Sequence, residues 1–410
     1  MRSFIKLIFW VGILLSKNVC IGQSGTALFF TTDQVKEFRS LLTTDSSFHH
    51  FADELRQHAQ ECLQSGPWRI TDYPSPAASG NPQDYYSEGP YWWPDPNNPD
   101  GPYIRRDGQV NPQHFSAHRA AFDQVCEATL TLAAAGYFFE DRASLDHARQ
   151  ILVAWYIDPE TRMNPHLEYG QAIRGVTEGR GIGIIDTTPL IDLVQGLYFL
   201  ELSGFWPAKE QVAMREWLRD YLTWLTTSQK GYDEQYHGNN HSTWWAAQVA
   251  SLALYLENHE TLQTVWQFFN AFLVPHQIAP NGSCPLEEER TRSLSYSVMN
   301  ADGFAILCRL ARYDGQDIWS VRGPQSGSIR TAAAYLAPYL ADPWRWKKPQ
   351  MSPFTPQRRK FLLIAALDLG QWEYARLAQS LPRAKGTLNA LLDLEFVVMT
   401  QPQMNNFLNR

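Results

Sequence analysis

Residues 242–273 read STWWAAQVASLALYLENHETLQTVWQFFNAFL, and this stretch decides the fold class. Apolar residues recur in it at intervals of three and four, as on the buried face of an amphipathic helix, and not at the interval of two that is typical of a strand. The polar residues around Asn258 interrupt the pattern once. We therefore predict two helices, over 242–257 and 261–273, joined by a short turn.

The same periodicity continues through most of the chain. Further helices are predicted over 115–138, 144–156, 188–202, 209–228, 293–313, 329–341 and 356–369. Helical hairpins in this number, without sustained alternating strands or a solenoid repeat, favour an all-α fold of the α/α toroid type, an incomplete barrel of helical hairpins. The chain has 410 residues, 44% of them hydrophobic and 19% charged, and no linker-like segment. We expect one toroid domain over residues 23–410.

The first 22 residues have the layout of a secretory signal peptide. Two basic residues, Arg2 and Lys6, precede a short apolar run, and small and polar residues follow it. The run is too short to span a bilayer. We therefore expect an exported protein, periplasmic or extracellular, with no membrane span and with the leader removed.

The composition limits the kinds of partner that the protein is expected to bind. The net charge is −7, which argues against nucleic acid because nucleic-acid binding needs an extended basic face. A cleft with a few local cations can still bind an anionic sugar polymer. The chain has no HExxH motif, no Asp-rich calcium loop and no CxxC pair, so neither a metal nor another cofactor is expected. Cys126 and Cys308 lie in apolar helical stretches and are predicted to be buried thiols. We expect a monomer.

Two long stretches lack the helical pattern. Residues 68–111 carry six aromatic residues between Tyr85 and Tyr103, which argues strongly against disorder. Residues 163–187 read MNPHLEYGQAIRGVTEGRGIGIIDT, and their five glycines suggest a backbone folded closely around something. Long loops of this kind inside a compact domain are typical of functional sites.

Two short segments combine residue types that could carry chemistry. Asn240 and His241 follow Asn239 at the start of a predicted helix, where the backbone amides favour an anion. An Asn-His pair there can hold a carboxylate and supply a base, although a capped helix with a locally packed histidine explains the pattern too. Further along, Arg290 and Arg292 precede Tyr296. The arginines could bind a carboxylate and lower the pKa of the phenol, but a surface ion-pair cluster fits as well.

Four blocks taken together resemble the alginate lyase superfamily, the α/α-toroid polysaccharide lyases of families five and thirty-eight. They are DYYSEGPYWWPDP with PYIRRDGQVNP, NPHLEYGQAIRG with GRGIGIIDT, GNNHSTWW, and RTRSLSY, in this order between residues 84 and 296. Family thirty-eight is the more similar branch, because YWWPDP and RRDG are typical of it. The resemblance implies that Asn240 neutralises the substrate carboxylate and that His241 and Tyr296 are catalytic. The family arginine corresponds to Arg290, with Arg292 as a neighbouring substrate-binding residue.

The resemblance also implies the reaction. A polysaccharide lyase cleaves a 1,4-linked polyuronate by β-elimination and leaves a 4,5-unsaturated end. H5 and O4 lie on the same face of a mannuronate ring, so one phenol could serve both as base and as acid, and we expect mannuronate-rich alginate to be preferred. Glucuronan shares this stereochemistry and is the alternative substrate. Candidate substrate contacts are Arg292, Asn239, Tyr91, Trp92, Trp93, Arg105, Arg106, Tyr169, Gln171 and Arg174.

Two other functions compete with this hypothesis. A glycoside hydrolase on the same fold would need paired carboxylates, for which Glu88, Asp95, Glu178 and Glu288 are candidates. A noncatalytic glycan-binding protein would explain the aromatic loops but not the Asn-His and Arg-Tyr segments. Formation of an unsaturated product distinguishes a lyase from both.

Overall fold

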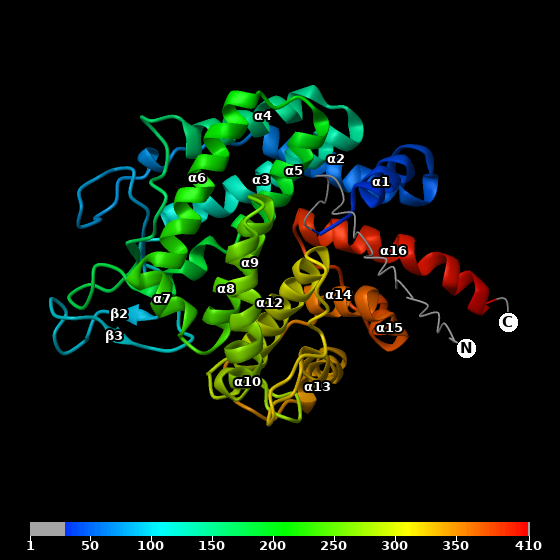
Figure 1. Ribbon diagram of the computed structural model, residues 1–410. Helices are drawn as coiled ribbons and strands as arrows, with labels where there is room; N and C mark the ends of the chain where they lie inside the picture. Colours follow the sequence, from blue (N-terminus) through cyan, green and yellow to red (C-terminus); the bar gives the residue numbers. More distant parts are fainter. Residues whose placement is uncertain (1–28, 409–410) are drawn as a thin grey trace, which may run out of the picture.

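The structure, a computed structural model, describes residues 29–408, so the predicted leader over residues 1–22 lies outside the described part. An inner ring of helices forms its centre (Figure 1). Each inner helix packs against the next, and the last packs against both its predecessor and the first. In chain order these helices are α3 (Ala117–Phe139), α5 (Leu190–Ser203), α8 (Asn240–Tyr255), α12 (Ser293–Tyr313), α14 (Lys360–Leu369) and α16 (Thr387–Leu408).

A second layer of helices covers the ring, and each of its members packs against an inner helix. This outer layer consists of α2 (His49–Leu63), α4 (Arg142–Leu152), α6 (Ala208–Thr227), α9 (His259–Phe268), α13 (Ile329–Ala341) and α15 (Trp372–Ser380). The remaining α-helices are α1 (Thr32–Thr44), α7 (Gln229–Gln235), α10 (Val274–Gln277) and α11 (Pro285–Glu288). The predicted α/α toroid is thereby confirmed.

Short non-α turns connect or extend these helices. They are η1 (Ser46–Phe48), η2 (Ile70–Asp72), η3 (Val153–Ile157), η4 (Gly181–Thr187), η5 (Phe269–Leu273) and η6 (Pro343–Arg345). Two of them, η3 and η5, are π-turns that end α4 and α9, over segments predicted as plain helix. A π-turn keeps the chain helical while it shifts the register of the last side chains, so the periodic pattern continues through it.

The inner helices are apolar on nearly all sides because other helices surround them. In α5, every residue from Leu193 to Leu200 is buried. The close packing of α3 and α5 depends on Gly196, where an added Cβ would lie 2.9 Å from the backbone Cα of Leu130. A larger residue at this position would push the two helices apart.

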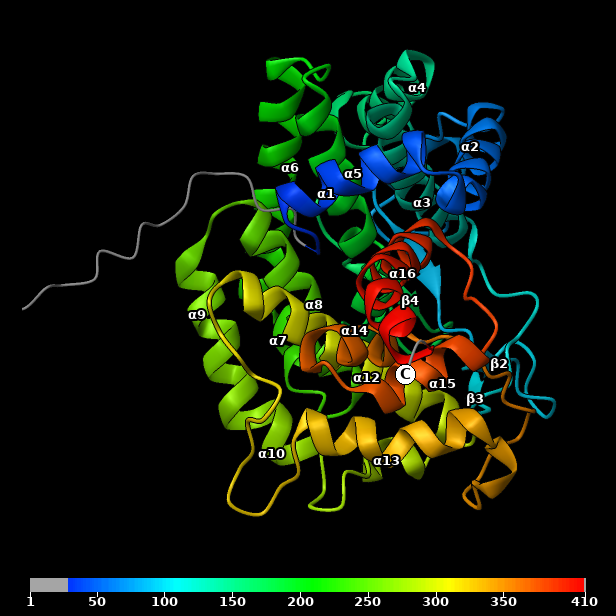
Figure 2. The ribbon, with the colours of Figure 1, turned by 90° about the vertical axis from the view of Figure 1, so that its right-hand side faces the viewer.

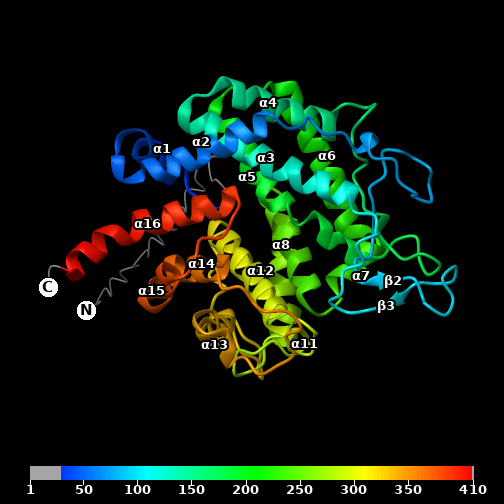
Figure 3. The same ribbon diagram turned by 180° about the vertical axis from the view of Figure 1, so that it is seen from behind.

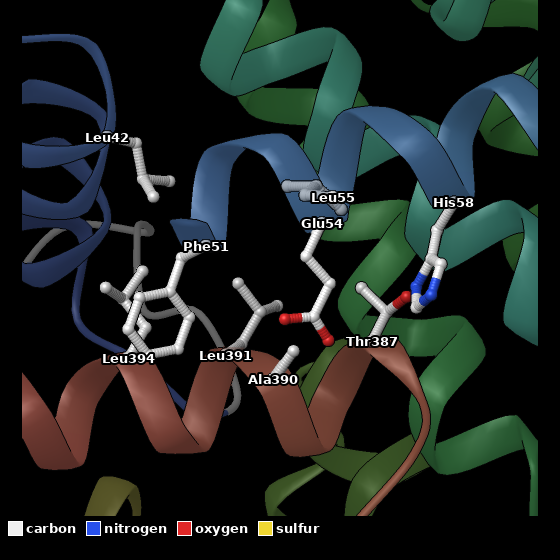
Figure 4. A pocket seen from close by; sticks show the side chains of 9 residues that line it. All are labelled: Leu42, Phe51, Glu54, Leu55, His58, Thr387, Ala390, Leu391 and Leu394. Carbon is white, nitrogen blue, oxygen red and sulfur yellow. The ribbon is translucent and has the colours of Figure 1, made fainter. Parts of the chain in front are cut away.

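A buried ion cluster joins the last two inner helices to α12. Arg309 of α12 is 2% exposed and forms ion pairs of 2.9 Å with Asp368 of α14 and with Glu395 of α16. Glu395 also accepts a hydrogen bond from Gln34, which brings the first helix against the last. Figure 4 shows apolar side chains of α1 and α2 that face α16 in the same region, among them Phe51.

The two non-helical stretches meet each other at the end of the molecule opposite α1 and α16 (Figure 3). Strand β1 (Tyr86–Glu88) pairs in parallel with β4 (Tyr169–Ala172), and β2 (Trp92–Trp93) pairs antiparallel with β3 (Ile104–Arg105). The aromatic loop and the glycine-rich loop, predicted separately, therefore form one unit.

Three further sequence expectations can be compared with the structure. Cys126 and Cys308 are buried thiols, as predicted, and Cys62 and Cys284 are free as well. No helix within residues 29–408 is long and apolar enough to cross a membrane. The helix predicted from residue 356 begins only at Lys360, because the backbone before it is drawn into tertiary hydrogen bonds, such as that from the Arg358 N–H to the Pro382 carbonyl at 2.8 Å.

Substitution of Arg309 should have a large effect on the free energy of unfolding. Arg309→Met would leave Glu395 buried without a cation and Asp368 with only the exposed Arg312, and we expect the free energy of unfolding to fall by about 3–5 kcal/mol. Arg312 contacts the same Asp368 but is 65% exposed, so Arg312→Met should cost less than about 1 kcal/mol. Denaturant unfolding of both variants tests the difference. Similar losses for the two variants would contradict this account.

Candidate active site

The first turn of α8 holds the Asn-His pair. The side chain of Asn239 caps the helix by accepting the backbone N–H of His241 at 3.1 Å. Asn240, 1% exposed, donates its backbone N–H to Glu287 at 2.6 Å and its side-chain Nδ2 to both carboxylate oxygens at 2.8 Å. Burial raises the pKa of Glu287, and the hydrogen bonds from Asn240 oppose that rise. The orientation of Asn240 is thus set by a buried acid 47 residues further along the chain.

A second buried acid holds His241. Nδ1 of His241 lies 2.9 Å from Oε1 of Glu234, and the ring of His237 stacks on the His241 ring at 4.9 Å. Burial lowers the pKa of His241 to about 4, so the imidazole is neutral near neutral pH. Burial also raises the pKa of Glu234 well above its usual value. Because Nδ1 is engaged, Nε2 is the nitrogen left for chemistry, and it has no hydrogen-bond partner within residues 29–408.

Tyr296 lies in the first turn of α12. Its hydroxyl is 2.7 Å from the hydroxyl of Tyr91, which comes from the aromatic loop. The guanidinium of Arg290 lies 4.0 Å from the centroid of the Tyr296 ring. The expected depression of the phenol pKa is wrong: burial and the hydrogen bond with Tyr91 raise the pKa of Tyr296, and Arg290 offsets only part of that rise. The phenol is therefore protonated in the free enzyme.

The two arginines differ in their partners. Arg290 donates to Asp107 through Nη2 at 2.9 Å and through Nε at 3.3 Å, and Thr291 also donates to that carboxylate. Although burial opposes it, the hydrogen bond from Arg290 holds the pKa of Asp107 far below its usual value. Arg292 has no ion pair within the described residues, and its Nε is buried without a hydrogen-bond partner. Arg292 is consequently the cation of this segment that is free to take an anion.

Two further cations, one from the aromatic loop and one from the glycine-rich loop, lie beside indole rings. The guanidinium of Arg106 lies 5.0 Å from the Trp93 ring, and that of Arg180 lies 5.7 Å from the Trp92 ring. Arg105 contacts Asp107 at 2.8 Å and so joins the Arg290 pair. The guanidinium of Arg106 forms no hydrogen bond or ion pair within the described residues and remains available to a ligand, whereas Arg180 donates Nε and Nη2 to Gln171.

The remaining candidates lie in the β1–β4 unit. Gln171 is buried, has a φ of 48°, and donates to Asp186 at 3.1 Å while it accepts from Arg180 at 3.0 Å. Arg174 forms an ion pair of 2.7 Å with Glu88, and half-buried Tyr169 packs against a small cluster that includes Ala172.

The structure thus brings together segments that are distant in the sequence. Asp107 joins the aromatic loop to Arg290, and Tyr91 joins that loop to Tyr296. Four participants were missed by the sequence reasoning, namely Glu234, Glu287, Asp107 and Arg180. An acidic residue within a predicted helix can be seen in the sequence, but the residue that it contacts in the fold cannot. Within residues 29–408 no group of three or more acidic, histidine or cysteine side chains is placed to hold a metal ion.

Two of the carboxylates that a hydrolase would need are already paired. Glu88 is bound to Arg174, and Glu288 forms an ion pair with Lys348. Neither is a free acid of the kind required to protonate a glycosidic oxygen.

Comparison with solved structures shows which proteins share this fold. The chain is similar to an alginate lyase from Bacteroides ovatus, with a TM-score of 0.82 and 30% identity over 88% of this chain and 97% of that chain. It shares its fold with alginate lyase A1-III from Sphingomonas species A1, with a TM-score of 0.53 and 15% identity over 83% and 86% of the two chains. A variant of A1-III complexed with a tetrasaccharide matches with a TM-score of 0.56 and 15% identity over 85% and 89%. The protein is a polysaccharide lyase.

The family model described as alginate lyase matches residues 69–346, which include both non-helical stretches and the first turns of α8 and α12. The chain therefore belongs to the alginate lyase family. A comparison with curated proteins finds no significant match.

The pKa of His241 predicts the acid limb of the activity profile. The ordinary value of 6.5 is lowered to about 4, so protonation begins only as the pH falls toward the lower value. We expect kcat/KM to stay nearly level from about pH 7 to about pH 5 and to fall close to about pH 4. The measurement is a pH series of initial rates. His237→Gln is the control, in which kcat/KM should fall at the same acidic pH as in the wild type. An acid limb centred on the ordinary histidine pKa would contradict the prediction.

Proposed function

We propose that the enzyme cleaves a 1,4-linked polyuronate by β-elimination, with mannuronate-rich alginate as its preferred substrate. Two observations support an anionic sugar chain as the substrate. The solved structures to which the chain is similar are described as alginate lyases. The site also holds Arg180, Arg290 and Arg292, of which Arg292 forms no ion pair within the described residues, and local cations of this kind suit a polyanion even in a protein whose net charge is −7.

The first task in the proposed reaction is to neutralise the uronate carboxylate, because its charge keeps H5 weakly acidic. Arg292, with its free guanidinium, is available to bind it in two-point geometry. Arg290 and Asn240 complete the proposed set, although Asp107 and Glu287 occupy part of their hydrogen-bonding capacity. Groups held in advance in this way stabilise charge as it develops, without having to reorganise during the reaction.

The second task is proton transfer. Tyr296 gives up its phenolic proton, for which Nε2 of the neutral His241 is the proposed acceptor. The phenolate then takes H5, the electron pair of that C–H bond forms the C4–C5 double bond, and the C4–O4 bond breaks. The proton that Tyr296 has gained goes to O4, and the proton held by His241 then returns to Tyr296, so that both groups regain their resting states. The phenol suits this second role, since it is a weak acid that is protonated at rest.

A different protonation pattern would suit guluronate. There H5 and O4 lie on opposite faces, so His241 would act as the base and Tyr296 only as the acid. The resting states of the two groups, a neutral imidazole and a protonated phenol, are those that this route requires. Guluronate-rich alginate is therefore the second candidate substrate. Glucuronan has the same stereochemistry as mannuronate and would be cleaved by the first route.

The observation that carries the proposal is the position of the Tyr296 hydroxyl. It lies 2.7 Å from the hydroxyl of Tyr91, on a ring whose centroid is 4.0 Å from the guanidinium of Arg290 and whose residue is in the first turn of α12. We also propose that the enzyme is exported, since residues 1–22 have the layout of a signal peptide.

A substrate panel tests the proposal. Polymannuronate, polyguluronate, glucuronan and mixed alginate are each incubated with the enzyme, and unsaturated ends are followed by ultraviolet absorbance. We expect the fastest rise on polymannuronate, and Tyr296→Phe should lower the rate by about 10²–10⁴-fold, the usual contribution of a general acid–base group. A fastest rate on polyguluronate would favour the second candidate. A Tyr296→Phe variant that retains more than about a tenth of the rate would contradict the assigned role.

A further inference from the structure

An exposed aromatic and basic segment lies outside the site described above. Residues 343–348 read Pro-Trp-Arg-Trp-Lys-Lys and follow α13 through η6. Trp344 is 84% exposed, the largest value among the exposed large apolar side chains of the described residues. Tryptophan is enriched at binding surfaces, where its large ring supplies contact area, and here it stands beside three basic residues.

The segment is firmly anchored. Trp346, two residues after Trp344, is buried, packs edge to face against Tyr339 at 4.8 Å and donates its indole N–H to the hydroxyl of Ser293 at 2.8 Å. The carboxylate of Asp342 caps the turn by accepting the backbone N–H of Trp344 at 3.2 Å. Trp344 is therefore held by its neighbours on a defined turn.

The anchor ties this segment to the start of α12, the helix that carries Tyr296. The backbone N–H of Ser293 donates to the Pro349 carbonyl at 3.0 Å, and that of Met351 donates to the Thr291 carbonyl at 2.8 Å. Residues 349–351 thus run along the stretch that carries Arg292 and opens α12. Figure 2 shows the orange chain that follows α13 on the same side of the molecule as β2 and β3.

The charge of the segment suits a polyanion. Arg345 and Lys347 are exposed and form no ion pair within the described residues, while Lys347 donates to the backbone carbonyl of Trp344 at 2.9 Å. Lys348 is paired with Glu288. An indole face can stack on the C–H face of a sugar ring, and the two unpaired cations can reach the carboxylates of neighbouring uronate units.

We propose that Trp344, Arg345 and Lys347 form an outer binding site for uronate units of a polymer whose reacting unit lies at Tyr296. The site binds the part of the polymer that extends from the reacting unit toward η6. The choice of a polyuronate as the occupant rests on the proposed function. The binding itself does not depend on turnover.

Affinity electrophoresis in gels that contain polymannuronate measures this binding without catalysis. The wild-type enzyme should be retarded by polymannuronate and not by neutral dextran. Trp344→Ala and the double variant Arg345→Gln/Lys347→Gln should each weaken the retardation about fivefold. Added salt should weaken the retardation further in Trp344→Ala, because this variant keeps both cations. Trp372→Ala is the matched control, because Trp372 is an exposed tryptophan (41%) on α15. Its retardation should equal that of the wild type.

Kinetics provide the second readout. Trp344→Ala should raise KM for long polymannuronate several times more than KM for the shortest oligomannuronate that the enzyme cleaves. An equal effect on both substrates, unchanged retardation, or the same loss in Trp372→Ala would overturn the outer site. If the wild type is retarded but forms no unsaturated ends, the proposed function fails while the outer site stands.

Discussion

The contact between Glu287 and Asn240 is the constraint on which the site depends. A buried carboxylate is stable only where donors surround it, and here the donors are the backbone N–H and the amide of one residue in the first turn of α8. Glu287 lies in α11, three residues before Arg290 in the chain. The same short helix therefore sets both the orientation of Asn240 and the entry into α12, and the ends of two inner helices are held in register.

Two other carboxylates act in the same way. Glu234 holds Nδ1 of His241, and Asp107 holds Arg290 while it fastens the aromatic loop. Asn240, His241 and Arg290 are thus each positioned by an acid from another element of the fold. Such acids limit the freedom of the groups before substrate arrives, which is how a rigid scaffold lowers the cost of reaching a transition state.

The helical part of this architecture could be predicted to a large extent. The bounds of α12 and α13 match the predictions, because the apolar stripe, the capping Ser328 and the following turn residues all agree there. The start of α14 could not be predicted, since Arg358 donates to the carbonyls of Ala378 and Leu381, contacts that no local pattern reveals. The pairing of β1 with β4 escaped prediction for the same reason.

The site shows a similar division. Motifs pointed to Asn240, His241, Arg290 and Tyr296, and the structure places each at a helix start or close before one. The predicted direction of the Tyr296 pKa shift was wrong, because charged residues can be counted in a sequence whereas the burial of a side chain cannot be read from it. The roles of Glu287 and its counterparts depend on contacts between residues far apart in the chain.

The most direct test of preorganisation by buried acids is the steady-state rate of Glu287→Gln. The amide has the shape of the carboxylate, but it can accept through only one oxygen, so Asn240 loses one of its hydrogen bonds to residue 287. We expect kcat to fall about a hundredfold with little change in KM or in thermal stability, while Glu289→Gln, on an exposed neighbour, keeps the wild-type rate. A Glu287→Gln enzyme with wild-type kcat would show that Asn240 does not need its buried acid, and would contradict the account.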